Sequence, residues 1–153
     1  MPNTKWSKLN KLQLGRYAEY YAKMEFASYG FEVYTSEVDD HGVDFIVKAP
    51  EGHNYYEIQV KSCRNLTYIF IPKSKMELTS NRIVCILLFT DNCLPDVYII
   101  PATAWLVEND LIKSKDYEGL KSAPEWGLNL SQKNLPLLAP YKIDNILAGG
   151  EFL

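Results

Sequence analysis

The sequence predicts one mixed α/β domain, in which an N-terminal helix is followed by a β-meander and a central mixed sheet. Three observations lead to this prediction. The length of 153 residues fits a single domain. An amphipathic helical pattern opens the chain, and short β-type runs between turn-forming segments follow it. No internal repeat and no Pro/Gly/Ser-rich linker divides residues 1–153, so we expect one folding unit.

The first element is a predicted helix over residues 11–29. Asn10, followed three residues later by Gln13, is typical of a capping box. Gly30 supplies a C-terminal stop. Between these signals, apolar side chains recur at intervals of three and four residues and predict the buried stripe: Leu14, Tyr17, Ala18, Tyr21 and Met24.

Short β-type runs come next. Residues 31–35, 43–48 and 55–61 predict an antiparallel meander, because the turn-forming segments DDHG (39–42) and APEGHN (49–54) separate them. Three further runs predict a hairpin-like strand ending at Pro72 and two buried strands: residues 66–71, 83–89 and 97–100.

The rest of the chain gives weaker signals. Thr103 is placed to cap a helix that continues through Ala104, Trp105 and Leu106. We expect short helices and loops that cover the sheet over residues 113–148.

Composition excludes several classes of protein. A hydrophobic fraction of 47% with 23% charged residues is that of a soluble globule, neither disordered nor membrane-spanning. The three cysteines form no CxxC pair, so neither a disulfide framework nor a four-ligand zinc site is expected. No apolar segment follows the N-terminal lysines, and we therefore expect a cytoplasmic location and no membrane partner.

Charge is unevenly distributed along the chain. The net charge is −3, yet the first sixteen residues hold Lys5, Lys8, Lys11 and Arg16 and no acidic residue. Such a local patch permits contact with nucleic acid on an otherwise acidic protein. A solvated helix end is the alternative interpretation.

Residues 55–61 carry the polar pattern that suggests chemistry. Because side chains alternate along a strand, Glu57, Gln59 and Lys61 should share one face, while Ile58 and Val60 point to the other. The run at 43–48 also carries an acid, Asp44, at the start of an otherwise apolar strand. If the two strands are neighbours, oxygen ligands and an ammonium group meet in a site suited to a hard divalent cation and an activated water.

At this point the sequence resembles a known family. The motifs G-x-x-x-E at 15–19, G-V-D at 42–44 and Q-V-K-S at 59–62 occur in the order found in the PD-(D/E)XK, or restriction-endonuclease-like, nuclease superfamily. The most similar branches are the archaeal Holliday-junction resolvases and the methylation-dependent restriction enzymes. The resemblance implies a three-layer α/β/α core around the central mixed sheet.

The resemblance also implies roles for single residues. Asp44 would bind Mg²⁺ or Mn²⁺, Lys61 would orient or polarise the attacking water, and Glu19 would complete the site from the helix. Gln59 stands where the family usually has an acid, which departs from the pattern. Glu57, on the same strand face, could supply a carboxylate ligand directly or through water.

The expected activity is that of a divalent-metal-dependent endonuclease acting on DNA. Arg16, Ser62 and Arg64 flank the motifs and are the expected DNA contacts. Cutting both strands of a duplex suggests a homo-oligomer, a dimer or higher. The alternatives are a non-catalytic nucleic-acid-binding or assembly module with a degenerate nuclease fold, and a nuclease acting on RNA.

Each site residue also has a structural explanation. Asp44 could cap the DDHG turn, Lys61 could pair with Glu57, and Glu19 could pair with Lys23 four residues further along the helix. Cys63 follows the motif but has no histidine partner that would activate its thiol.

Overall fold

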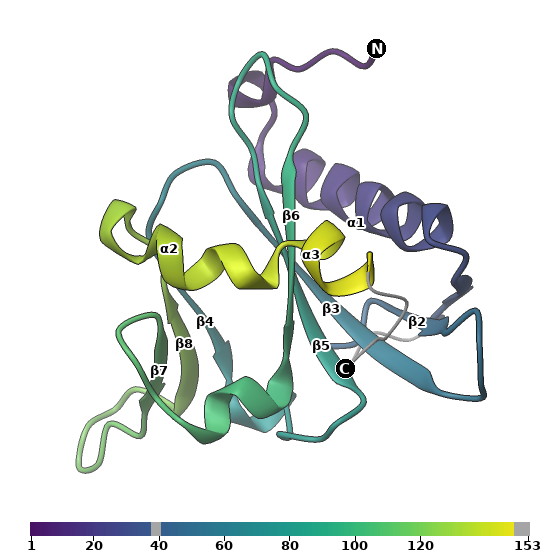
Figure 1. The fold of residues 1–153 in the computed structure, drawn as a ribbon. Helices are drawn as coiled ribbons and strands as arrows, with labels where there is room; N and C mark the ends of the chain where they lie inside the picture. The colour runs from purple at the N-terminus through teal and green to yellow at the C-terminus, as the bar shows by residue number, and fades with distance from the viewer. Residues whose placement is uncertain (38–40, 149–153) are drawn as a thin grey trace.

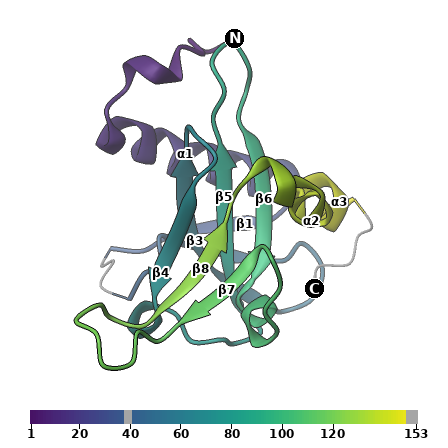
Figure 2. The ribbon, with the colours of Figure 1, turned by 90° about the vertical axis from the view of Figure 1, so that its left-hand side faces the viewer.

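The computed structural model, which describes residues 1–37 and 41–148, contains two sheets packed against each other (Figure 1). The larger sheet has the strand order β1-β2-β3-β5-β6, and the smaller one has the order β4-β8-β7. Helix α1 covers one face of the larger sheet, and the smaller sheet lies on the other face (Figure 2). No helix among the described residues is long and apolar enough to cross a membrane.

Helix α1 spans Lys11–Ser28 and confirms the predicted helix. Both halves of the capping box form between Asn10 and Gln13. The buried face consists of Leu14, Ala18, Ala22 and Phe26. Placing Met24 on this face was wrong, because its side chain is 58% exposed. The buried residues follow one another at intervals of four, and Met24 lies two residues from both Ala22 and Phe26, which places it on the opposite side of the helix.

The predicted meander is confirmed. Strands β1 (Glu32–Thr35), β2 (Phe45–Lys48) and β3 (Tyr55–Cys63) pair antiparallel in chain order. Strand β5 (Arg82–Leu88) then pairs parallel to β3, and β6 (Asp96–Pro101) pairs antiparallel to β5. The central sheet is therefore mixed, as expected.

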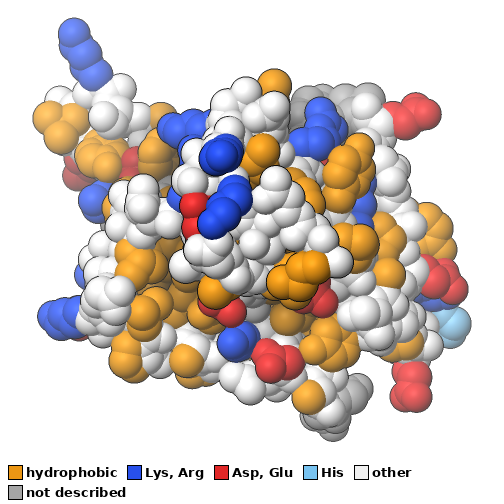
Figure 3. Space-filling model, turned by 90° about the horizontal axis from the view of Figure 1, so that it is seen from above, with side chains coloured by type: hydrophobic (Ala, Val, Ile, Leu, Met, Phe, Trp, Pro, Cys, Tyr) orange, Lys and Arg blue, Asp and Glu red, His pale blue; other side chains and the backbone are white. Residues whose placement is uncertain are grey.

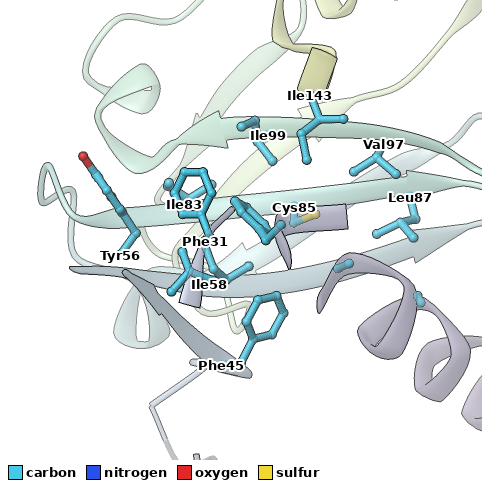
Figure 4. Packing of buried hydrophobic residues seen from close by; sticks show 14 of the residues in the cluster. Phe31, Phe45, Tyr56, Ile58, Ile83, Cys85, Leu87, Val97, Ile99 and Ile143 are labelled. Atoms are coloured by element: carbon cyan, nitrogen blue, oxygen red, sulfur yellow. The ribbon is translucent and has the colours of Figure 1, made fainter. Parts of the chain in front are cut away.

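The main core lies between α1 and the larger sheet. Strands β2, β3, β5 and β6 contribute Phe45, Ile58, Cys85 and Ile99, which Figure 4 shows packed together. Helix α3 (Ile143–Leu147) adds Ile143 to the same cluster. All five side chains are at most 5% exposed. Because Ile58 points into this core, its neighbours along β3 point to the other face of the sheet, away from α1.

The layer opposite α1 differs from the expectation of short helices and loops over 113–148. This segment contributes two strands, β7 (Ile112–Lys115) and β8 (Glu125–Asn129), and β8 pairs with β4 (Tyr68–Pro72). Strand β8 carries only two large apolar side chains, Trp126 and Leu128, with Gly127 between them, and glycine weakens a strand signal. The third layer of the core is thus mainly a sheet.

Short helical turns complete the molecule. They are η1 (Trp6–Lys8), η2 (Lys73–Lys75), η3 (Ala102–Leu106), η4 (Gln132–Asn134), α2 (Leu135–Leu138) and η5 (Ala139–Tyr141). The predicted cap at Thr103 was wrong, because η3 follows Pro101 and no side chain caps it. Its Trp105 is buried, and the indole N–H donates to the carbonyl of Gly127 at 2.9 Å.

Candidate active site

The side chains of β3 alternate as predicted. Ile58 and Val60 pack into the core beneath α1. Gln59 and Lys61 lie in register with Val84 and Ile86 of β5, which belong to the second core between the two sheets. The polar face of β3 therefore points away from α1, toward the layer formed by the smaller sheet.

Asp44 lies at the point where β2 and β3 part. Its backbone N–H donates to Ile58 O at 2.8 Å, and its Oδ2 accepts from the backbone N–H of Val60 at 2.6 Å. Since Phe45 pairs with Ile58, Asp44 stands opposite Gln59 across the two strands. The structure thus brings together Asp44 and Gln59, as expected from neighbouring strands.

The turn-capping alternative for Asp44 involves the DDHG segment. Its two aspartates, Asp39 and Asp40, lie outside the described residues. The hydrogen bond to Val60 ties the carboxylate of Asp44 to β3 whether or not it also caps the turn.

Gln59 is almost completely buried, with 7% of its surface exposed. Its Oε1 has no hydrogen-bond partner within residues 1–37 and 41–148, and burying such an oxygen costs about 1–3 kcal/mol. Gly42, at φ +76°, packs against the amide: a Cβ there would lie 3.2 Å from Nε2 of Gln59. Gly42 therefore covers this side chain, and a cation or a water would satisfy the oxygen of Gln59.

Glu57 has a partner that the sequence did not suggest. The Nε of Arg82, which is 8% exposed, lies 3.7 Å from Oε1 of Glu57, and the two residues are in register on β3 and β5. Nη1 of Arg82 also donates to the carbonyls of Lys75 at 3.0 Å and His41 at 3.5 Å. The predicted alternative of a Glu57–Lys61 pair is thus replaced by a Glu57–Arg82 pair. The one sequence signal for Arg82 is its position as a charged residue at the start of an otherwise apolar run.

Lys61 is half-buried between the two sheets. It lines a narrow apolar cavity together with Ile69, Phe70, Ile71, Val84, Ile86, Trp105, Trp126 and Leu128. The smaller sheet thus covers the stem of this lysine.

Burial raises the pKa of the Cys63 thiol to about 11, and the nearby Lys61 only partly opposes the shift. Cys63 therefore stays protonated near neutral pH and is no candidate nucleophile.

Glu19 does not share the polar face of β3. It lies on α1, on the opposite side of the sheet from Lys61, and pairs with Lys23 at 3.4 Å. The Nζ of Lys23 stands 5.7 Å from the ring centre of Phe45, the residue after Asp44. The Glu19–Lys23 pair is therefore adjacent to the start of β2, and Glu19 could approach Asp44 only around that end of the strand.

The three expected DNA contacts differ in their surroundings. Arg16 is exposed on α1, and Ser62 is half-buried near the end of β3. Nη1 of Arg64 donates to the carbonyls of Trp6 and Leu9 and so fastens the N-terminal segment to β3. Arg64 therefore has a structural role in holding the N-terminal segment.

Exposed basic side chains lie along the N-terminal segment that Arg64 holds. Lys5, Lys8 and Lys11 are exposed, and Figure 3 shows basic side chains over the N-terminal segment in the centre of the view. Asp91 lies in the same region and accepts hydrogen bonds from the backbone and the hydroxyl of Ser7. These bonds lower the pKa of Asp91. The positive region is therefore broken by at least one carboxylate.

The residues present fit a small oxygen-ligand site. Within the part of the chain that the structure describes, no three His, Cys, Asp or Glu side chains gather into a metal-binding cluster. Asp44 stands opposite Gln59 across the two strands, and Oε1 of Gln59 is buried without a partner among the described residues, so adjacent positions of the two strands offer oxygen ligands. Mg²⁺ accepts such a sparse set, because it retains waters and takes substrate phosphates as further ligands.

The fold is similar to that of a known nuclease. No protein-family model matches the chain, and comparison with curated proteins gave no match. A solved structure of Hjc from Archaeoglobus fulgidus, a Holliday junction resolvase, superposes with a TM-score of 0.56 at 14% sequence identity. The match covers 91% of this chain and 98% of that one. The chain therefore has a restriction-endonuclease-like mixed α/β fold, similar to that of this archaeal resolvase over nearly its whole length.

Proposed function

We propose that this protein is a divalent-metal-dependent endonuclease that hydrolyses phosphodiester bonds of DNA. The observation that carries the proposal is that Asp44 stands in register with Gln59, whose buried Oε1 is unsatisfied among the described residues, on the strand face that also carries Lys61. The likeness in fold to a Holliday junction resolvase supports it.

The carboxylate of Asp44 and the amide oxygen of Gln59 would hold Mg²⁺ or Mn²⁺. When bound, the cation would polarise the scissile phosphate as a Lewis acid. The hydrogen bond from Val60 fixes the orientation of the Asp44 carboxylate. The loop at Gly42 packs against the Gln59 amide, so both oxygens are held before any ligand arrives.

Lys61 would act on the phosphate and on the attacking water. Apolar neighbours surround its stem, and the charge of a half-buried ammonium acts through a medium of lower dielectric constant than water. Its positive charge stabilises the negative charge that develops on the phosphoryl oxygens during in-line attack. The ammonium can also orient the water by a hydrogen bond.

Glu57 is expected to remain paired with Arg82 rather than to serve as a ligand. The guanidinium is buried and also holds two backbone carbonyls, so releasing Glu57 would leave Arg82 without its carboxylate. We include Glu19 as a contributor from α1, which requires that it leave Lys23 and approach around the start of β2.

Two chains would act together on a duplex. Each chain offers one pair of Asp44 and Gln59, so two cuts are most simply made by a two-fold dimer. The exposed Lys8, Lys11 and Arg16 would contact phosphates of the bound duplex. Light scattering with and without DNA tests the dimer, and a monomer in both conditions would contradict it.

The proposal is tested by cleavage of DNA. Plasmid, linear and four-way-branched DNA are incubated with the protein in Mg²⁺ or Mn²⁺, beside the Asp44→Ala variant and a sample in EDTA. We expect metal-dependent scission by the wild type and none by Asp44→Ala. RNA of the same sequence tests the alternative substrate.

The neutral Gln59 also favours a second candidate, a non-catalytic nucleic-acid-binding module. An amide oxygen binds Mg²⁺ more weakly than a carboxylate does. DNA binding by the wild type with no cleavage in any metal, and no difference in Asp44→Ala, would establish this second function.

A further inference from the structure

The outer face of the smaller sheet is uncovered among the described residues. Figure 2 shows β4, β8 and β7 in front, with the larger sheet and α1 behind them. Alternation along the strands places Ile69, Ile71 and Leu128 on the inner side, in the second core. The outer side therefore carries the intervening residues, among them Tyr68 and Phe70.

Tyr68 lies flat across this outer face. A Cβ at Gly127 would come within 2.0–2.6 Å of the ring and hydroxyl of Tyr68, so glycine is what allows the ring to lie over β8. The hydroxyl donates to Oε2 of Glu125, which is buried. Burial and this hydrogen bond raise the pKa of Tyr68, so the hydroxyl remains a donor at neutral pH.

Phe70 lies on the same face of β4 as Tyr68, and 51% of the surface of Phe70 is exposed. It is in register with Gly127, which has no side chain to shield the ring. A half-exposed phenyl ring on a strand leaves apolar surface in water, at a cost of roughly 25 cal/mol per Å². The sheet thus presents an aromatic surface that nothing in the described structure covers.

Two lysines of β7 border the aromatic surface. Lys113 is in register with Gly127 and Lys115 with Glu125, and neither forms an ion pair within the described residues. Nζ of Lys115 lies 4.2 Å from the ring centre of Tyr68. Glu125, in register with Lys115, is buried beneath Tyr68, and Glu108 accepts from the backbone N–H of Ser114 between the two lysines. The ammonium groups of Lys113 and Lys115 therefore stay available to phosphates.

We propose that this face binds single-stranded nucleic acid, with a base stacked on Phe70 and phosphates at Lys113 and Lys115. Unstacked bases stack favourably on exposed aromatic rings, and the positive charges of the two lysines attract the phosphate backbone. Bases within a duplex are already stacked and cannot reach the ring. The proposal rests on the proposed function only in taking nucleic acid as the substrate.

The position of the face relates it to the candidate active site. Ile69 and Ile71, on the inner side of β4, line the same narrow cavity as Lys61. A strand bound to the outer side of β4 would thus lie one sheet thickness from the candidate catalytic lysine. Such a surface would hold the unpaired nucleotides of a branched or frayed DNA next to the duplex that is cut.

Binding is measured directly by fluorescence anisotropy, in EDTA, with a labelled oligothymidylate of about 12 nucleotides. Phe70→Ala should weaken binding about tenfold, Phe70→Leu should do the same, and Phe70→Tyr should retain wild-type affinity, because stacking needs a ring. Lys113→Gln with Lys115→Gln should lower the slope of log K against log salt by about 1.4, since single strands lose about 0.7 per phosphate contact.

Matched controls lie on the larger sheet and on η4. Tyr34→Ala removes a ring that is 45% exposed on β1, and Lys48→Gln with Lys133→Gln removes two other lysines; both should bind as the wild type does. Circular dichroism of Phe70→Ala checks folding, and Phe70→Tyr, which preserves the packing of the strand, keeps the test decisive.

Two outcomes would overturn the proposal: no binding of the oligonucleotide by the wild type, or equal binding by Phe70→Ala. Equal binding together with a change of oligomeric state in Phe70→Ala would instead assign this face to a second copy of the chain. Because the assay contains no metal, loss of cleavage in Asp44→Ala has no bearing on it.

Discussion

Gln59 is the residue at which the candidate site departs from an acidic one, and its neighbours explain how a neutral side chain fits there. Asp44 stands opposite it, and Glu57 lies two residues away on the same strand face. Arg82 pairs with Glu57, and Lys61 lies on the same face of β3 as Gln59. A third carboxylate at 59 would be buried beside two anions and would raise the free energy of the metal-free protein.

Gln59→Glu should therefore bind Mn²⁺ about tenfold more tightly, because a carboxylate replaces an amide oxygen, and should unfold more readily without metal. Isothermal titration and urea denaturation measure the two effects. Glu57→Gln, on the same strand, is the control and should leave Mn²⁺ affinity within about twofold. Unchanged or weaker Mn²⁺ binding by Gln59→Glu would remove residue 59 from the ligand set.

Arg82 should be structurally important. Arg82→Met leaves Glu57 without its cation and frees the carbonyls of Lys75 and His41, so we expect a loss of about 2–3 kcal/mol in the free energy of unfolding. The side chain of Glu57 is 36% exposed, and water therefore limits the loss. Adding Glu57→Gln should recover part of it in urea denaturation. A double variant less stable than Arg82→Met alone would contradict the pairing.

The three cysteines should react differently. Cys63 and Cys85 are buried, and burial raises the pKa of both thiols, while Cys93 is exposed. At pH 8 the folded protein should release one equivalent of thionitrobenzoate from Ellman's reagent rapidly, and Cys93→Ser should release none. As pH rises toward the Cys63 pKa of about 11, a second thiol becomes reactive. Rapid reaction of two thiols at pH 8 would contradict this packing.

At the scale of elements, local signals were sufficient for α1 and for the meander. The capping box and the turn-forming segments act over three to six residues, and both predictions hold. Strand β8 gave no such signal, because its partner β4 is distant in sequence: the side chains of Tyr68 and Glu125 meet across 57 residues. The Glu57–Arg82 pair was missed for the same reason, since it depends on the parallel pairing of β3 with β5. Adjacent strands, by contrast, were enough to predict that Asp44 faces Gln59.

Gly127 should resist substitution. Gly127→Ala would place a Cβ against the ring of Tyr68 and force it off Glu125, which we expect to cost about 1–3 kcal/mol. In a Tyr68→Ala background the same substitution should cost almost nothing, and a double-mutant cycle in urea measures the difference. Additive losses would mean that Tyr68 does not occupy the space above Gly127.

At the scale of the whole molecule, the candidate site lies between two layers that different parts of the chain supply. Asp44 immediately precedes β2, β3 provides Gln59 and Lys61, and the smaller sheet closes over Lys61. The indole N–H of Trp105 joins the layers through the carbonyl of Gly127. The site is therefore assembled only when both sheets are in place.

The most direct test of this account is the thermal stability of the protein in Mn²⁺. A ligand that binds only the folded state stabilises it by RT ln(1 + [L]/Kd), which is about 2.7 kcal/mol at a hundredfold excess over Kd and about 5–10 °C in Tm for a domain of this size. We predict such a rise for the wild type and for Lys61→Met, which keeps both oxygens but should not cleave DNA, and no rise for Asp44→Asn. A wild-type Tm that does not respond to Mn²⁺, or an Asp44→Asn variant that responds equally, would contradict the assignment of Asp44 and Gln59 as the metal site.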